Sequence, residues 1–226
     1  MEYELIGKSM PAVEFTFQRG ESVYTQRGGM VWMSDGIRME TGVKDGILGG
    51  LGRKLRGETF FLSSFYAEED GAYVAFAPAF PGEIIPVRMG GPVICQKRAF
   101  LCATQGIVAK TTFTKKFSVG LFGGEGFILQ RVSGNGMLFL EVDGNLHEIT
   151  LEEGETISVD SGNLVAFEES VSYDIRMMTG KNLLFGGEGI FLTMLTGPGT
   201  VYLQTLNFLQ MLNSHASTSA SQQQNR

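Results

Sequence analysis

The feature that most constrains this chain is a six-residue motif that occurs twice. Residues 121–126 and 184–189 both have the sequence Leu-Phe-Gly-Gly-Glu-Gly, and they lie 63 residues apart. A looser third copy, Leu-Arg-Gly-Glu-Thr, occupies residues 55–59, and each copy is followed by an apolar, β-prone run. A period of this length indicates a chain built from repeated structural units.

A second pattern repeats out of phase with the first. Residues 20–25, 90–95 and 154–159 align without gaps, and each segment continues through a turn into an apolar run. The alignment makes two sets of positions equivalent: Thr25, Cys95 and Val159, and Trp32, Cys102 and Ala166. In both patterns an apolar run, a turn and a second apolar run follow one another, so we predict that both form β-hairpins.

Joining the two patterns gives three units of about 65 residues each. One unit is split between the chain ends, with one half at residues 11–42 and the other at residues 183–206. We therefore expect residues 13–17 to pair beside residues 201–205 and to close the structure. Closure would remove free sheet edges, which otherwise invite aggregation.

These units predict an all-β fold, a closed β-barrel-like prism of three pseudo-symmetric repeats. We expect a single domain over residues 1–208 and a disordered tail over residues 209–226, which are rich in Ser, Gln and Asn. Residues 47–56 place leucines at helical spacing among glycines, which predicts at most a short helix there.

Composition excludes several classes of protein. The net charge of −6 disfavours nucleic acid as a partner. Two cysteines are too few for a disulfide framework. The chain has neither a secretory signal nor an apolar run of the roughly 20 residues that a membrane-spanning helix needs. We therefore expect a cytoplasmic protein without a transmembrane segment.

Residues suited to catalysis are scarce. Only two histidines occur, and His147 falls in a predicted strand, so a histidine metal site is not expected. The aligned positions of Cys95 and Cys102 hold threonine, valine, tryptophan and alanine in the other units, which favours small core-facing residues over nucleophiles. We predict no catalytic residue and no cofactor.

Three glutamates of the first pattern are the only candidates for a metal site. Glu58, Glu125 and Glu188 each follow a glycine shortly before an apolar run. Three carboxylates held close together would repel one another and raise one another's pKa. The alternative is structural, with each carboxylate accepting hydrogen bonds from backbone N–H groups of its turn. We favour the structural role, in which Glu125→Gln costs less stability than Glu125→Ala.

The chain resembles the family named for altered inheritance of mitochondria protein 24 over about residues 2 to 208. The resemblance is carried by both Leu-Phe-Gly-Gly-Glu-Gly copies and by residues 40–42, 57–62, 74–78, 81–86 and 164–171. It implies a prism related to the tryptophan RNA-binding attenuation protein fold and a tendency to self-assemble. Mitochondrial relatives are associated with inner-membrane organisation, and most bacterial and archaeal members are uncharacterised.

Three functions are compatible with these features. The first is a non-enzymatic scaffold or binding protein that forms a homo-oligomer, with a trimer favoured, and that meets protein partners at a membrane surface. The second is a single-stranded RNA-binding protein, which the related fold suggests by analogy alone. The third is a small-molecule enzyme, which the missing acid–base groups disfavour.

Overall fold

The computed structural model describes residues 1–26, 28–43, 61–115, 126–178, 190–208 and 210–211. Over these residues the chain forms strands β1 to β19 and two short 3-10 turns, η1 (Lys97–Ala99) and η2 (Ser161–Asn163). The predicted all-β class is therefore confirmed. The predicted helix at residues 47–56 and nearly all of the predicted tail lie outside the described residues.

The strands form four antiparallel sheets, which we number 1 to 4. Sheet 1 has the order β1-β2-β7-β4, with bounds Glu2–Ile6, Ala12–Thr16, Tyr73–Phe76 and Met30–Met33. Sheet 2 has the order β5-β6-β3-β10-β13-β8, with bounds Ile37–Val43, Phe61–Ala67, Ser22–Thr25, Phe100–Thr104, Met137–Asp143 and Gly82–Arg88. Sheet 3 has the order β11-β12-β9-β16-β19-β14, with bounds Ile107–Lys115, Phe127–Gly134, Val93–Gln96, Leu164–Glu168, Gly199–Gln204 and Leu146–Leu151. Sheet 4 has the order β15-β18-β17, with bounds Thr156–Asp160, Ile190–Thr196 and Ser172–Met178.

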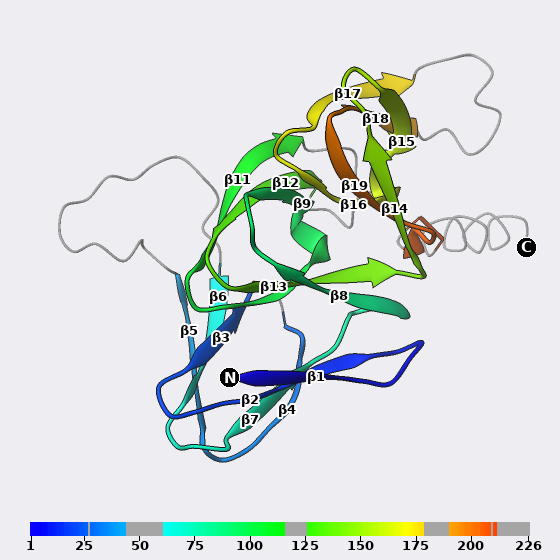
Figure 1. Cartoon of the computed structure of the whole chain (residues 1–226). Coiled ribbons are helices and arrows are strands. Elements are labelled where there is room, and N and C mark those ends of the chain that lie inside the picture. Colours follow the sequence, from blue (N-terminus) through cyan, green and yellow to red (C-terminus); the bar gives the residue numbers. More distant parts are fainter. Residues whose placement is uncertain (27, 44–60, 116–125, 179–189, 209, 212–226) are drawn as a thin grey trace, which may run out of the picture.

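The four sheets are stacked, with sheet 1 at one end and sheet 4 at the other (Figure 1). A separate apolar core fills each space between neighbouring sheets. The core between sheets 1 and 2 contains Phe15, Phe65, Phe76 and Phe139. The core between sheets 2 and 3 contains Cys95, Phe100, Leu138 and Ala166. The core between sheets 3 and 4 contains Leu129, Phe167, Phe191 and Leu195. Because each inner sheet faces a core on both sides, its central strands are apolar on both faces.

The two six-stranded sheets have the same strand order. Raising every label of sheet 2 by six gives the order of sheet 3. The same step turns the first half of sheet 3, β11-β12-β9, into the whole of sheet 4, β17-β18-β15. The second half of sheet 2 is β10-β13-β8, and the second half of sheet 3 is β16-β19-β14. Lowering the labels β10-β13-β8 by six gives β4-β7-β2, which are three of the four strands of sheet 1.

The predicted hairpins are wrong, because the chain turns a corner at each of these places. Strands β12 and β13, which the first pattern was expected to pair, lie in sheets 3 and 2. Strand β12 already pairs with β11 on one edge and β9 on the other, so it has no edge left for β13. The second pattern behaves in the same way, since β3 and β4, β9 and β10, and β15 and β16 each lie in different sheets.

The strands after the second set of corners share an irregularity. The pairing register shifts between Met30 and Trp32 in β4, between Phe100 and Cys102 in β10, and between Leu164 and Ala166 in β16. An extra residue of this kind bends and twists a strand. The three shifts fall at positions that the sequence alignment makes equivalent.

The predicted closure of the chain on itself is also wrong. Strand β2 pairs with β1 and β7, whereas β19 pairs with β14 and β16, so residues 13–17 do not lie beside residues 201–205. Strand β1 occupies the edge of β2 that faces away from β7, a place that no described strand fills in sheets 2 and 3, which end at β8 and β14. No closed barrel is found within the described part of the chain.

Candidate functional site

Both cysteines are core residues, as predicted. Cys95 on β9 and Cys102 on β10 are fully buried and unpaired. Burial raises the pKa of the Cys95 thiol to about 12 and raises that of Cys102 well above its ordinary value. Since the thiolate is the nucleophile, these side chains are held in their unreactive form.

His147 is a strand residue, as predicted, and it lies exposed on β14 opposite Leu203 of β19. Glu58, Glu125 and Glu188 lie outside the described residues, so their structural role stays a prediction. Among the residues that the structure does describe, no group of three or more His, Cys, Asp or Glu side chains could hold a metal ion.

Two glutamates of the second pattern show what a Gly-Glu turn does in this fold. Glu21 Oε2 accepts a hydrogen bond from the backbone N–H of Gln18 at 2.8 Å, and Glu155 Oε2 accepts one from the backbone N–H of Glu152 at 2.9 Å. The glycine before each glutamate has a positive φ, 88° at Gly20 and 79° at Gly154, which side-chain-bearing residues rarely adopt. Here the carboxylate holds the turn into the following strand.

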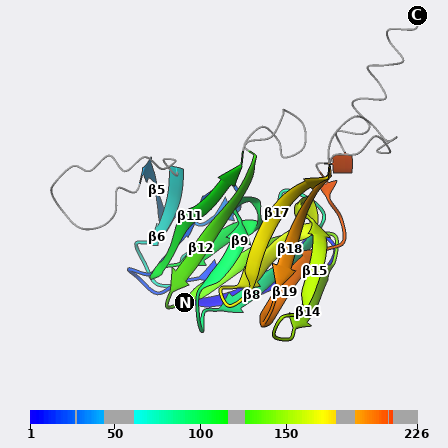
Figure 2. The same cartoon turned by 90° about the horizontal axis from the view of Figure 1, so that it is seen from above.

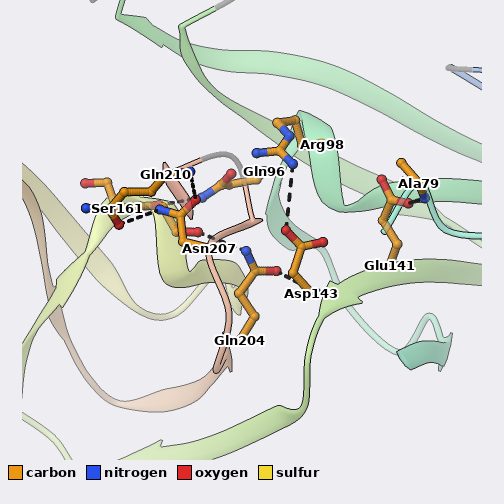
Figure 3. A network of polar contacts seen from close by, with 10 residues as sticks. Ala79, Gln96, Arg98, Glu141, Asp143, Ser161, Gln204, Asn207 and Gln210 are labelled. Carbon is orange, nitrogen blue, oxygen red and sulfur yellow. Dashed lines mark hydrogen bonds and ion pairs between the residues drawn. The ribbon is translucent and has the colours of Figure 1, made fainter. Parts of the chain in front are cut away.

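A network of polar contacts lies where sheets 2 and 3 meet the η2 turn, and we call its central residues the polar corner (Figure 3). It consists of Gln96, Arg98, Asp143, Ser161 and Gln204. The backbone N–H of Asp143 donates to Gln204 Oε1 at 3.0 Å, and Gln204 Nε2 donates to the backbone oxygen of Gly162 at 2.9 Å. Gln96 Nε2 donates to the backbone oxygen of Ser161 at 2.5 Å. These bonds join β13 of sheet 2 to β9 and β19 of sheet 3.

Asp143 is the one carboxylate buried in the polar corner. Burial raises the pKa of its side chain, and the guanidinium of Arg98, whose Nη2 lies 3.8 Å from Oδ2, acts in the opposite direction. The cavity beside these groups has a volume of only about 10 Å³. That space holds one water molecule at most, and the hydrogen bonds of the polar corner fasten sheets 2 and 3 together.

A larger groove of about 470 Å³ opens where the β8–β9 turn meets the β16–β17 turn. It is lined by residues 87–93, residues 168–170 and Tyr202. At Glu169 the carboxylate accepts two hydrogen bonds from Arg131, from Nε at 2.5 Å and from Nη2 at 3.0 Å. Glu168 Oε2 accepts the backbone N–H of Thr200 at 2.9 Å. Both carboxylates of the groove therefore support the fold locally.

Comparison with known proteins places this architecture in a family. The family model described as mitochondrial biogenesis AIM24 matches residues 3–206. The chain belongs to the AIM24 family. An uncharacterized protein of Streptococcus pyogenes is 31% identical over 216 residues, which cover 91% of this chain and 86% of that protein.

A solved structure has the same architecture. The crystal structure of a Streptococcus pyogenes protein determined by structural genomics is similar with a TM-score of 0.76 and 25% identity, and the match covers 96% of this chain and 99% of that one. No helix in the described part of this AIM24-family chain is long and apolar enough to cross a membrane.

Strand β4 gives this AIM24-family protein an exposed apolar surface within the described part of the chain. All four of its residues are apolar and exposed: Met30 at 37%, Val31 at 51%, Trp32 at 39% and Met33 at 39%. The equivalent strands β10 and β16 are buried over the same positions, with Cys102 and Ala166 at 0%. The sequence alignment therefore located the strand but gave no sign of its exposure, because the exposure depends on which strand lies beside it.

Proposed function

We propose that this protein is a non-enzymatic scaffold or binding protein, built from three equivalent units, that works in the cytoplasm as a homo-oligomer. A trimer is the favoured assembly, and protein partners, including partners at a membrane surface, are its expected ligands. The identical strand order of sheets 2 and 3 supports the repetition of units.

The observation that carries this proposal is the exposure of β4. A run of four exposed apolar residues that includes the single tryptophan of the chain is costly in water. Exposed apolar patches of this kind usually mark interfaces between proteins. Methionine and tryptophan are both enriched at such interfaces.

The chemistry of the other candidates supports a binding role over catalysis. Cys95 and Cys102 are buried with raised pKa values, which fits a reducing compartment and no nucleophilic function. The cavity beside Asp143 and Gln204 has a volume of only about 10 Å³, and the carboxylates of the groove are hydrogen-bonded to Arg131 and Thr200.

Size-exclusion chromatography with light scattering tests the proposal. We expect a mass close to three times the 24.6 kDa of one chain at micromolar concentration. A mass of 24.6 kDa at every concentration would contradict self-assembly. The alternative, a single-stranded RNA-binding protein, is checked on protein isolated from its native organism. Bound RNA would raise the ratio of the ultraviolet absorbance of nucleic acid to that of protein.

A further inference from the structure

Each inner sheet consists of two three-stranded halves, and one pair of adjacent strands connects them. We call this pair of strands the joint of the sheet. In sheet 2 the joint is β3–β10, with Ala103 opposite Tyr24, and in sheet 3 it is β9–β16, with Ala166 opposite Cys95. The sequence alignment makes β3, β9 and β15 equivalent, and likewise β4, β10 and β16. A third joint of the same kind would pair β15 with β4.

Within one chain this third joint is not made. Among the described residues β15 pairs only with β18, and β4 pairs only with β7. The two strands belong to sheets 4 and 1, which lie at opposite ends of the stack (Figure 1). Seen from above, β15 is at the outer rim beside β18 (Figure 2). Each chain therefore carries both halves of one joint at two distant edges.

We infer that β4 of one copy pairs antiparallel with β15 of a second copy of this chain. The contact joins the four strands of sheet 1 to the three strands of sheet 4 in one continuous sheet. This inference rests on the proposed self-assembly and names the surfaces that produce it. Because the two edges differ, the contact is head-to-tail, and it closes a ring where the rotation between copies allows it.

The register of the contact follows from sheet 3. There Ala166 lies opposite Cys95 and Phe167 opposite Ile94. In the sequence alignment Trp32 is equivalent to Ala166, and Val159 is equivalent to Cys95. The register of sheet 3 therefore places Trp32 opposite Val159. The next pair outward is Met33 with Ser158.

The chemistry of the two edges fits this pairing. Protein edges that stay free usually carry a charge or a proline, whereas β4, Met30–Met33, has neither. On β15 the apolar side chains of Ile157 and Val159 alternate with Thr156 and Ser158, as in a half-buried strand. Pairing would satisfy the backbone groups of both edges and remove Val31 and Trp32 from water.

Cysteine cross-linking tests the register. Met33→Cys and Ser158→Cys are made as separate variants, since residues directly opposite one another in a sheet are within disulfide reach. The native Cys95 and Cys102 are fully buried and do not interfere. Under mild oxidation we expect a reducible dimer band in the mixture of the two variants and none in either variant alone.

A matched pair serves as the control. Ser172 lies exposed on β17, at the opposite edge of sheet 4, so Met33→Cys mixed with Ser172→Cys should give no dimer band. If the wild-type protein is oligomeric by light scattering and the Met33/Ser158 mixture gives no more dimer than this control, the β4–β15 contact is refuted and the proposed function stands. If the wild-type protein is monomeric, both are refuted.

A second pair of variants tests the surface without relying on disulfide formation. Val31→Arg places a charge on β4, and Val108→Arg places one on β11, where the native residue is equally exposed, 50% against 51%. We expect Val31→Arg to reduce the mass to 24.6 kDa with an unchanged circular dichroism spectrum, and Val108→Arg to leave the mass unchanged. An assembly that survives Val31→Arg overturns the inference.

Discussion

The indole Nε1 of Trp32 donates a hydrogen bond to Oε2 of Glu14 at 2.6 Å. Both residues are opposite Ala75 in the sheet register, one on β4 and the other on β2, with β7 between them. The small side chain of Ala75 lets the indole lie across β7 and reach the carboxylate. Since Trp32 is the only tryptophan of the chain, its fluorescence reports directly on β4.

Glu14→Ala should release the indole of Trp32 from this position. We expect a red-shifted emission and a loss of stability of at most about 1 kcal/mol. The loss stays small because Glu14 also lies opposite Glu4, and removing one of two facing like charges relieves repulsion. Glu14→Gln, which keeps an acceptor oxygen, should retain the wild-type emission. Equal red shifts in both variants would show that the hydrogen bond does not position the indole.

Phe139→Ala should be among the most destabilising single changes in the chain. Phe139 is fully buried and meets the rings of Phe15 and Tyr3 edge-on, at centroid distances of 4.9 and 5.0 Å. Truncating a buried phenylalanine costs about 3–5 kcal/mol, because the lost contacts leave a cavity. Urea unfolding measures the loss, and Tyr73→Ala, at an exposed position of sheet 1, is the control that should cost far less. Equal losses would place Phe139 outside the core.

The buried thiols predict a weakness at alkaline pH. The pKa of Cys95 rises from 9.0 to about 12 on folding, so the folded state holds a proton that the unfolded state releases. The resulting stabilisation is complete below pH 9.0 and is lost progressively as the pH approaches about 12. Urea unfolding across this range should therefore show a steeper fall for wild type than for Cys95→Ala.

Thiol titration checks the same burial independently. At pH 8 a thiol reagent should find no reactive cysteine in the folded protein and two after unfolding, since Cys95 and Cys102 are the only cysteines. Rapid labelling of one thiol in the folded protein would contradict the burial of that residue.

The Gly-Glu turn before β15 predicts a graded response to substitution. Glu155→Ala removes the acceptor of the Glu152 N–H and should cost about 1 kcal/mol. Glu155→Gln keeps an oxygen at the same place and should cost less. Glu153→Ala, two residues earlier in the same turn, is the control for the loss of a surface carboxylate. Thermal melts that rank the glutamine variant below the alanine variant would contradict the turn-holding role.

The part of the fold that could be predicted is the part that local sequence encodes. Alternating apolar runs and glycine turns specify strands, and the repeats align the equivalent strands, as the shared register shifts at Trp32, Cys102 and Ala166 illustrate. A hairpin and a corner have the same local pattern. Which of them forms depends on the edges that other segments already occupy, as β11 and β9 occupy those of β12.

The exposure of β4 could not be predicted for the same reason. The apolar run of residues 30–33 resembles those of the buried strands β10 and β16, and only the absence of a described neighbour beyond β4 leaves it at the surface. Strand β1 escaped prediction because it lies beyond β2, at a place that no described strand fills in sheets 2 and 3, which end at β8 and β14. With β1 on one edge and β7 on the other, β2 has no edge left for residues 201–205.

Hydrogen exchange at β4 tests the central claim most directly. If β15 of a second copy covers β4, the backbone amides of β4 that point away from β7 exchange slowly at high protein concentration and fast on dilution, while those of the buried strand β10 stay slow throughout. Val31→Arg should show the fast exchange at every concentration. Exchange at β4 that is fast and independent of concentration in an oligomeric wild-type protein would contradict the claim.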